Sequence, residues 1–581
     1  MLLPTLKETS TKRLVTSKFG GYDHRLRIED GQWWDMKNLT SDHWPMLASR
    51  PARGIGEAIP SPGGLTAKDC LIWVSGGSVV VNGKTVDLQL TEDGPKQLVS
   101  MGAFLVIWPD KKYLNTGDLT DFGPLEADYQ AGEDAEVLFR LCDAEGTEYQ
   151  NIQTQQPETP QTGDLWMEDH QLKKYDAATG AWTAVPDVYV KILCADIGQA
   201  FDAWDGVELS GIAYSGDSET LTAQYAQLNA TKVITAKGDD YLVVVGIVDR
   251  NASQTGGLRV RRRVPDMDYV CQAQNRLWGC KYGVVGGKPV NELYCCKLGD
   301  FKNWNCFMGI STDSWAASVG SDGAFTGAIT YQGYPTFFKE NRMHRIAVST
   351  SGAHQVTDTA ARGVQKGSWR SLCVVNEVLY YKGRTEVCAY DGSVPCAISA
   401  QLGDARYSEA VGGGAGGKYY VSMREGAGAY SLFVYDTARG MWHREDDFRP
   451  LMFAACDDDL FAIEEGTGKL VALYGTQGTA EDGVEWEAVT GILAYEYPDR
   501  KYLGRMDLRV QLQGELTLYV RYDSGGPWER LSRVCWQRGT TRTFAVPVIP
   551  RRCDHFQLKL AGRGEMRLFS LAKILEMGSD L

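Results

Sequence analysis

Residues that could bind a metal ion or a phosphate are present, but their spacing matches no established site of either kind. Only seven His occur in the chain, and no two have the spacing of a helical zinc site such as HExxH. Asp457-Asp458-Asp459 offers carboxylates that suit Ca²⁺, yet the run lacks the ligand register of an EF-hand loop. Residues 412–417 are rich in glycine, but Lys418 is followed by Tyr419 where a phosphate loop needs Ser or Thr, so we interpret them as a flexible connection. The pattern predicts no metal, no cofactor and no catalytic residue.

Three arginines at alternate positions are candidates for contact with DNA or with a partner protein. Arg259, Arg261 and Arg263 would share one face of a strand, because side chains alternate between the two faces of a sheet. Guanidinium groups on one face can bind phosphates or a partner's carboxylates. The alternative is a solvated edge strand whose charges discourage wrong strand pairing. Both interpretations stay open at this stage.

The first residues of the chain form a basic leader. Lys7, Lys12 and Arg13 lie among Ser and Thr, and they are further candidates for contact with a partner or with DNA. The leader is either a poorly ordered tail or an arm that docks on a neighbouring subunit. It has no long apolar segment, and the longest apolar run, residues 241–248, is too short to span a bilayer. We therefore expect no secretion signal and no membrane anchor.

Two tryptophans are candidates for binding sugars. Trp166 and Trp182 lie in a stretch whose amino-acid composition differs from that of the rest of the chain. Exposed aromatic rings can stack on a glycan. The alternative is that both form the core of a small β-module. A glycosidase would instead need two carboxylates roughly 5 to 10 Å apart, which a sequence does not show. Ser321-Asp322-Gly323 with Phe325 imitates the Asp box of sialidases only loosely and once.

Composition indicates that short strands must position these residues. The chain of 581 residues predicts several domains, and its 64 Gly, 28 Tyr and 16 Trp favour many strands joined by tight turns. Fourteen Cys occur without a CxxC pair, so we expect reduced core residues. The formal charge of −14 argues against binding of nucleic acid over a large surface, since phosphate binding needs clustered Lys and Arg. The negative charge is compatible with a surface that DNA passes without binding to it.

Two short sequence motifs, called phrases below, each occur twice along the chain. Tyr175-Asp176, Gly180 and Trp182 reappear at the same spacing as Tyr435-Asp436, Gly440 and Trp442. Gly117-Asp118 with Phe122 is matched by Gly299-Asp300 with Trp304. Asp can bond its own backbone in a turn, Gly supplies a positive φ, and the aromatic residue is expected to cover a neighbouring sheet. Each phrase therefore predicts a strand, a turn and a returning aromatic residue.

Apolar pairs spaced about 40 to 42 residues apart, from Phe337 to Phe461, match the length of a four-stranded propeller blade. Near the C-terminus, Met506, Leu508, Val510 and Leu512 alternate with polar residues, which predicts half-buried antiparallel strands. We predict an all-β protein, a β-propeller with an inserted small β-module and a C-terminal antiparallel β-sandwich. The expected parts are an extended arm with first strands (1–60), the first part of the propeller (61–125), the insertion (126–233), the second part of the propeller (234–449) and the sandwich with closing strands (450–581).

A further set of short sequence phrases is spread over most of the chain, outside the insertion. At the start these are Phe19-Gly20-Gly21-Tyr22, Asp35-Met36-Lys37-Asn38-Leu39, Pro45-Met46-Leu47 and Arg50-Pro51-Ala52-Arg53-Gly54. Further along they are Gly327-Ala328-Ile329, Phe337 to His344, Val378-Leu379-Tyr380-Tyr381, Asp391-Gly392-Ser393 and Arg551 to Phe556. None is a catalytic signature, but in this order the phrases resemble those of phage tail nozzle and head-to-tail DNA-stabilisation proteins.

The resemblance implies a structural virion protein and not an enzyme. Such a protein forms a ring, expected to be a homo-hexamer, that conducts and retains the genome in the phage tail. Its expected partners are the portal, the adaptor and other tail proteins, with transient passage of double-stranded DNA, and it would be made in the host cytoplasm. The alternative is a receptor-binding or tail-fibre-like module that binds host surface glycans through the insertion. A propeller glycosidase is a third, less favoured hypothesis.

Overall fold

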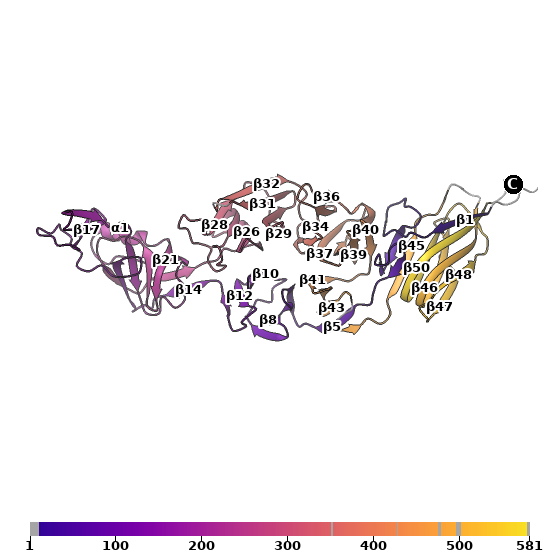
Figure 1. The fold of residues 1–581 in the computed structure, drawn as a ribbon, viewed down its shortest axis with the longest axis horizontal. Helices are drawn as coiled ribbons and strands as arrows, with labels where there is room; N and C mark the ends of the chain where they lie inside the picture. Colours follow the sequence, from indigo (N-terminus) through magenta and orange to yellow (C-terminus); the bar gives the residue numbers. More distant parts are fainter. Residues whose placement is uncertain (1–10, 350–351, 427, 475–477, 496–500, 578–581) are drawn as a thin grey trace, which may run out of the picture.

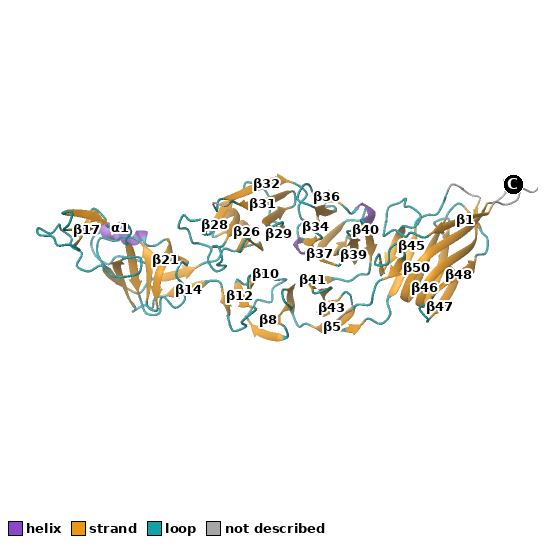
Figure 2. Ribbon diagram, viewed as in Figure 1, coloured by secondary structure: helices purple, strands orange, loops and turns teal. Residues whose placement is uncertain are grey.

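A computed structural model describes residues 11–349, 352–426, 428–474, 478–495 and 501–577. Three modules follow one another along the long axis of the molecule (Figure 1). The insertion lies at one end, the propeller lies in the middle, and a platform made from both ends of the chain lies at the other end. Strands dominate all three (Figure 2). The predicted fold class, all-β with a propeller, an inserted β-module and a sandwich, is confirmed.

Seven antiparallel sheets form the blades of the propeller. The first strand of one blade packs on the first strand of the next, as β6 does on β10, β10 on β25, β25 on β29, β33 on β37 and β37 on β41. The short helix η1 (Trp369–Ser371) packs against both β29 and β37, and β41 returns to β6, so the ring closes. Radial stacking buries the apolar faces that a single sheet of this size would expose.

Six blades have four strands in chain order. They are β6 (Pro62–Ala67), β7 (Leu71–Ser75), β8 (Ser78–Val81) and β9 (Lys84–Asp87); β10 (Gln97–Met101), β11 (Phe104–Trp108), β12 (Lys112–Asn115) and β13 (Phe122–Pro124); β25 (Tyr269–Ala273), β26 (Arg276–Val285), β27 (Lys288–Cys295) and β28 (Trp315–Ser318); β29 (Gly327–Tyr331), β30 (Tyr334–Lys339), β31 (Arg342–Val348) and β32 (His354–Ala360); β33 (Cys373–Val375), β34 (Val378–Lys382), β35 (Val387–Tyr390) and β36 (Cys396–Ala397); and β37 (Tyr407–Ala415), β38 (Lys418–Glu425), β39 (Tyr430–Asp436) and β40 (Met441–Arg444). A second short helix, η2 (Ala400–Leu402), precedes the sixth of these blades.

The seventh blade joins distant parts of the chain. It contains β41 (Pro450–Cys456), β42 (Asp459–Glu464), β43 (Lys469–Ala472) and β44 (Thr479–Ala480), and β5 (Gly54–Ala58) inserts between β43 and β44. A strand that precedes the first blade therefore completes the last blade, which fastens the ring and covers an open sheet edge. The boundary expected at residue 450 is wrong, because residues 450–480 belong to the propeller.

The insertion is larger than the sequence indicated. An eight-stranded sheet contains β14 (Ala127–Gln130), β15 (Glu136–Cys142), β19 (Tyr189–Leu193), β20 (Gly206–Ser210), β21 (Thr231–Gly238), β22 (Tyr241–Val245), β23 (Ala252–Thr255) and β24 (Arg259–Arg262). A three-stranded sheet contains β16 (Leu165–Glu168), β17 (Gln171–Asp176) and β18 (Ala181–Ala184), and α1 (Glu219–Gln227) begins after its N-cap Ser218. The boundary expected at residue 233 is wrong: β14 pairs with β24, so the module ends where it began.

The platform is a long, bent sheet built on two strands of 22 residues, β46 (Lys501–Tyr522) and β50 (Phe556–Met577), which pair along their whole length. One side carries β47 (Glu529–Trp536), β48 (Thr541–Pro547) and β49 (Arg552–Cys553). The other side carries β1 (Thr11–Thr16), β4 (Leu47–Ser49), β45 (Glu485–Thr490), β2 (Trp33–Lys37) and β3 (Leu39–Thr40). Residues 11–16 thus pair with β50 of the same chain.

The alternating pattern of the sequence determines which face of the platform is buried. Met506, Leu508, Val510 and Leu512 are all buried, as the sequence predicted. The two halves of β46 turn the same face inward, and Leu508 and Leu518 line one small internal space between them. Gly514 allows the bend, since its φ of +146° lies outside the range that other residues favour. The platform is the predicted antiparallel sandwich.

Replacing Gly514 with Ala tests the role of this bend. An added Cβ would lie 2.0 Å from the carbonyl oxygen of Arg563. We expect Gly514→Ala to lower the free energy of unfolding of the platform by about 2 kcal/mol or more, from strain at positive φ together with this clash. The matched control is Gly525→Ala in an open turn, where the nearest atom lies 3.8 Å from the added Cβ, and its effect should stay within about 0.5 kcal/mol. Urea unfolding measures both, and equal effects would contradict the assigned role.

Candidate functional site

Two buried arginines hold the chain where it passes from the platform to the propeller. Arg50 and Arg53 flank the connection between β4 and β5. Arg53 donates to Glu445 at 2.6 Å and to Asp446 at 2.9 Å, in the connection between β40 and β41. Arg50 donates to Glu481 at 2.8 Å and also contacts Asp446. One network therefore joins the platform, the last two blades and the closing strand.

The arginines lower the pKa values of two carboxyl groups in this network, Asp446 and Glu481, against the effect of burial. Burial raises the pKa of Asp446, but the Arg53 and Arg50 guanidinium groups outweigh it and hold that pKa below the usual value of 3.8. Glu481 behaves in the same way, with its pKa lowered by Arg50 and Arg53 against the effect of burial. The sequence indicated residues 50–54 only as part of a resemblance. It did not indicate Glu445, Asp446 or Glu481 as their partners.

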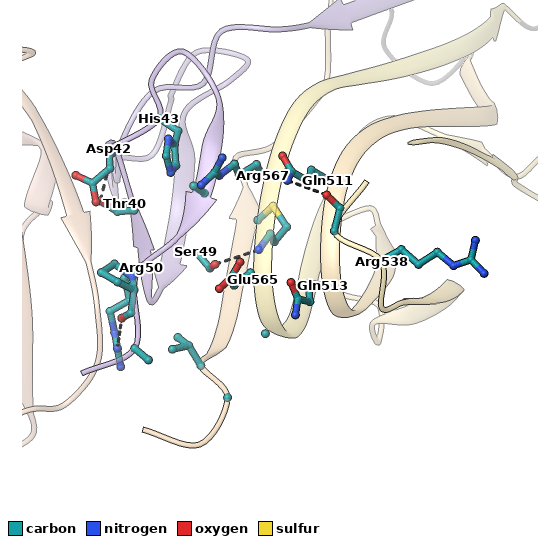
Figure 3. A pocket seen from close by; sticks show the side chains of 18 residues that line it. Thr40, Asp42, His43, Ser49, Arg50, Gln511, Gln513, Arg538, Glu565 and Arg567 are labelled. Carbon is teal, nitrogen blue, oxygen red and sulfur yellow. Dashed lines mark hydrogen bonds between the residues drawn. The ribbon is translucent and has the colours of Figure 1, made fainter. Parts of the chain in front are cut away.

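Beside the network lies a cavity of about 740 Å³ between the platform and the segment that leads to the propeller. Arg567 projects across the opening toward His43, whereas Arg538 points away from it (Figure 3). Gln511 donates to the carbonyl of Gly539 at 2.8 Å, and Ser49 accepts the amide of Met566. The cavity combines hydrogen-bond donors and acceptors with both signs of charge, which suits polar side chains of another protein better than an apolar ligand.

Arg259 and Arg261 lie on β24 and Arg263 follows its last residue, and all three already pair with carboxylates of the same chain. Arg259 pairs with Asp128, and both Arg261 and Arg263 pair with Glu208, the latter at 2.8 Å. The interpretation as an edge strand is also wrong, since β24 lies between β14 and β20. These arginines stabilise the part of the insertion next to the propeller, because carboxylates on adjacent strands neutralise most of their charge.

The candidates of the leader divide between described and undescribed residues. Lys7 lies outside the described residues. Lys12 and Arg13 lie on β1 at the edge of the platform. Arg13 is largely exposed and contacts Asp507 at 3.4 Å. The described part of the leader is therefore held by strand pairing with β50.

The two tryptophan candidates come together on the outer face of the three-stranded sheet. The rings of Trp166 and Trp182 meet at 5.5 Å, and Tyr175 lies 5.2 Å from Trp182. All three are partly exposed, whereas Leu165 and Leu172 on the opposite face are buried. The alternative in which both tryptophans form the core of the module is therefore wrong. Figure 1 places this sheet, through β17, at the far end of the molecule.

The repeated phrase forms the same hairpin twice. Tyr175 lies opposite Trp182, as Tyr435 does opposite Trp442. Gly180 and Gly440 have nearly equal φ values of +64° and +65°. The outcome differs at the aromatic residue, because Trp442 is fully buried and Trp182 is not. The local pattern thus fixed the turn and not the environment.

The aromatic residue of the second phrase is buried against a neighbouring blade in one copy and exposed in the other. Trp304, after Gly299-Asp300, is buried and meets Trp108 of the neighbouring blade edge-on at 6.2 Å. Phe122, after Gly117-Asp118, is 43% exposed. The turn signal was the same in both, so the neighbouring blade decides whether the ring is covered.

Other candidates have structural roles. Asp459 is buried and accepts the amides of Leu460 and Tyr474, so it shapes a turn. Residues 412–414 lie within β37 and are packed, which corrects the interpretation of this run as a flexible connection. Burial lowers the pKa of His443 to about 3 and keeps it neutral. Among the described residues, no group of three or more His, Cys, Asp and Glu could hold a metal ion, and no helix could cross a membrane.

All fourteen cysteines lie in the described part of the chain, and every one is a free thiol. Nine are buried, as expected for reduced core residues, whereas Cys396 and Cys535 are exposed. Desolvation raises the pKa of buried thiols such as Cys271, to about 12. These buried thiols are therefore poor nucleophiles and serve in packing.

No protein-family model and no curated protein matches this chain. Among solved structures it is similar to an exo-beta-1,3-galactanase from Phanerochaete chrysosporium, with 9% identity and a TM-score of 0.22, over 52% of this chain and 94% of that one. A glycoside hydrolase family 43 arabinoxylan arabinofuranohydrolase from Bacillus subtilis has 9% identity and a TM-score of 0.17, over 54% and 95%. The extracellular domain of a one component system from B. thetaiotaomicron has 9% identity and a TM-score of 0.16, over 92% and 98%.

These comparisons correct one expectation from the sequence. The chain was expected not to be an enzyme, yet the structures it matches include two that are named as family 43 glycoside hydrolases and one that is named as an exo-beta-1,3-galactanase. That exclusion is therefore withdrawn. With TM-scores of 0.22 and below, the likenesses assign no reaction to this chain.

Removing one arginine of the buried network tests its weight in stability. Arg53→Ala leaves Glu445 and Asp446 without their main partner, and we expect a loss of about 3 to 5 kcal/mol in the free energy of unfolding. The matched control is Arg342→Ala, which breaks a more exposed pair with Asp358 and should cost less than about 1 kcal/mol. Chemical denaturation of the full chain measures both. Similar losses would show that the network is only a surface feature.

The network also predicts an acid-sensitive platform junction. The pKa values of Asp446 and Glu481 are lowered in the folded protein, so their stabilisation is complete above their ordinary values of 3.8 and 4.5. It is lost as the pH falls through the lower folded values. Limited proteolysis from pH 7 to pH 3 should show cleavage between residues 41 and 53 only at the acid end. Equal protection at every pH would contradict this.

Proposed function

We propose that this chain is a structural virion protein that forms a ring in a phage tail, as a nozzle or as a head-to-tail stabilising ring. The observation that carries the proposal is the closed propeller fastened by β5 and tied to the platform by Arg50 and Arg53. A conduit for a genome must stay stiff and must not pair its strands with those of other molecules. Radial repetition of the blades leaves only short strand edges, and the buried network fixes the junction.

The ordered resemblance of the sequence to phage tail proteins supports the same proposal. A formal charge of −14 suits a wall that double-stranded DNA passes without being trapped. In this role the protein assembles as a homo-hexamer, contacts the portal, the adaptor and other tail proteins, and resides in the virion after synthesis in the host cytoplasm. Conduction and retention of the genome are then properties of the ring rather than of one subunit.

Electron microscopy of the purified protein tests the proposal. We expect rings with cyclic symmetry, either alone or on a complex of portal and adaptor, because a conduit requires several subunits around one axis. Light scattering at micromolar concentration should give the mass of the same oligomer. A monodisperse monomer that does not assemble on portal and adaptor would count decisively against a ring.

A second candidate function is recognition of host surface glycans by the end of the insertion. The specific observation is the partly exposed cluster of Trp166, Tyr175 and Trp182 on the outer face of the three-stranded sheet. Lys173 lies 5.6 Å from the centre of the Trp166 ring and pairs with Glu168, so hydrogen-bonding groups border the aromatic rings. Apolar rings beside polar groups match the two kinds of surface that a pyranose presents.

A glycan array with the full chain tests this second function. Trp182→Ala should reduce any binding about tenfold or more, since stacking on an aromatic ring contributes about 1 to 3 kcal/mol in related contacts. The matched control is Trp204→Ala, which removes an exposed tryptophan of the same insertion outside the aromatic cluster. Absence of binding by the wild-type protein, or equal loss in both variants, would remove the glycan hypothesis.

A further inference from the structure

The charge of this chain is segregated along its length. Residues 501–577, which form most of the platform, carry 14 Lys and Arg against seven Asp and Glu, a formal charge of +7. Residues 127–262, the insertion, carry ten Lys and Arg against 22 Asp and Glu, a formal charge of −12. Figure 1 places these two modules at opposite ends of the molecule. The overall charge of −14 therefore conceals a basic end.

Part of the positive charge on the platform is already neutralised within the chain. Arg505, Arg533, Arg551 and Arg563 are exposed, and each pairs with a carboxylate, at Asp507, Glu515, Glu529 and Asp482 respectively. Because each of these arginines is paired with a carboxylate, the pairs contribute little net positive charge. Other residues must account for the basic character of the platform.

Much of the remaining positive charge comes from five exposed arginines that form no ion pair within the described residues: Arg509, Arg530, Arg538, Arg542 and Arg567. Arg509 lies two residues before Gln511 on β46, and Gln511 is the register partner of Arg567 on β50. These side chains therefore share the outer face of the platform, because residues at alternate positions point to the same side of a sheet. Arg567 extends into the mouth of the cavity and Arg538 lies on its rim (Figure 3).

The mixture of groups on this face favours a protein partner over nucleic acid. Glu565 and Asp42 line the same cavity as Arg567, and Glu515 lies further along β46. A duplex carries one phosphate charge about every 1.7 Å and is bound by clustered Lys and Arg, whereas carboxylates placed among the arginines repel its phosphates. Separate arginines with glutamines between them instead match discrete carboxylates, which the guanidinium fork can bind with two hydrogen bonds.

We propose that the outer face of the platform is a docking surface for an acidic surface of another protein, with Arg509, Arg538 and Arg567 as its main contacts. The partner is recognised by clustered Asp and Glu side chains, one of which enters the cavity beside Arg567. This inference rests on the proposed function in one respect: it gives the chemistry of the protein on which the ring would sit. It also assigns a direction to the subunit, since only one end is basic.

Binding of defined polyanions to the full-length protein tests this docking surface. The probes are a labelled peptide of twenty glutamates, a DNA duplex of twenty base pairs, and vesicles with anionic lipid. We expect the wild-type protein to bind the glutamate peptide in preference to the other two, with affinity that falls as salt is raised. Changing Arg509, Arg538 and Arg567 together to Glu should weaken this binding about tenfold or more, because each reversal replaces attraction by repulsion.

The matched control changes the same charge elsewhere. Lys84, Arg384 and Lys469 are exposed on the propeller, and their joint replacement by Glu should leave peptide affinity within about twofold. Circular dichroism and thermal unfolding check that both triple variants fold. Preferred binding of the duplex or of the vesicles would overturn the proposal in favour of nucleic acid or membrane. No peptide binding, or equal weakening in both variants, would also overturn it.

Assembly is measured separately, so the two proposals can fail independently. Rings that form without affinity for the peptide would leave the proposed function in place and remove the docking surface. Peptide binding by a protein that stays monomeric on portal and adaptor would keep the docking surface and remove the ring.

Discussion

The pairing of Arg50 and Arg53 with Glu445, Asp446 and Glu481 is the constraint on which the other modules depend. The chain crosses there from the platform into the strand that completes the propeller. Charges buried this deeply are tolerated only when paired, so the three segments have one low-energy arrangement. That arrangement, together with the hydrophobic cluster shared by the platform and the propeller, sets the position of the platform relative to the propeller.

Closure of the propeller has the same long-range character. β5 pairs with β43, more than 400 positions further along the chain. Contacts at such separation require the intervening blades to be in place before the last one is complete. The insertion does not interfere with closure of the propeller, because its first and last strands, β14 and β24, pair with each other. A module can thus be carried between two blades without opening the ring.

Charge segregation adds a direction to an otherwise repetitive body. The propeller repeats one unit seven times, whereas the two end modules differ in fold and in sign of charge. The basic outer face of the platform and the partly exposed aromatic cluster of the insertion are both surfaces without partners in a single chain. They belong to the two modules at opposite ends of the propeller (Figure 1).

The sequence by itself determined the local structure. Alternation from Met506 to Leu512 gave the buried face of β46, a spacing of about 40 residues indicated blades, and the Tyr-Asp phrase specified the same hairpin at Gly180 and Gly440. These features depend on neighbours along the chain. Only the tertiary structure decided the number of blades, the end of the insertion, the partners of Arg259, and why Trp442 is buried while Trp182 is partly exposed. Each of these depends on a segment brought from far along the chain, which no local spacing encodes.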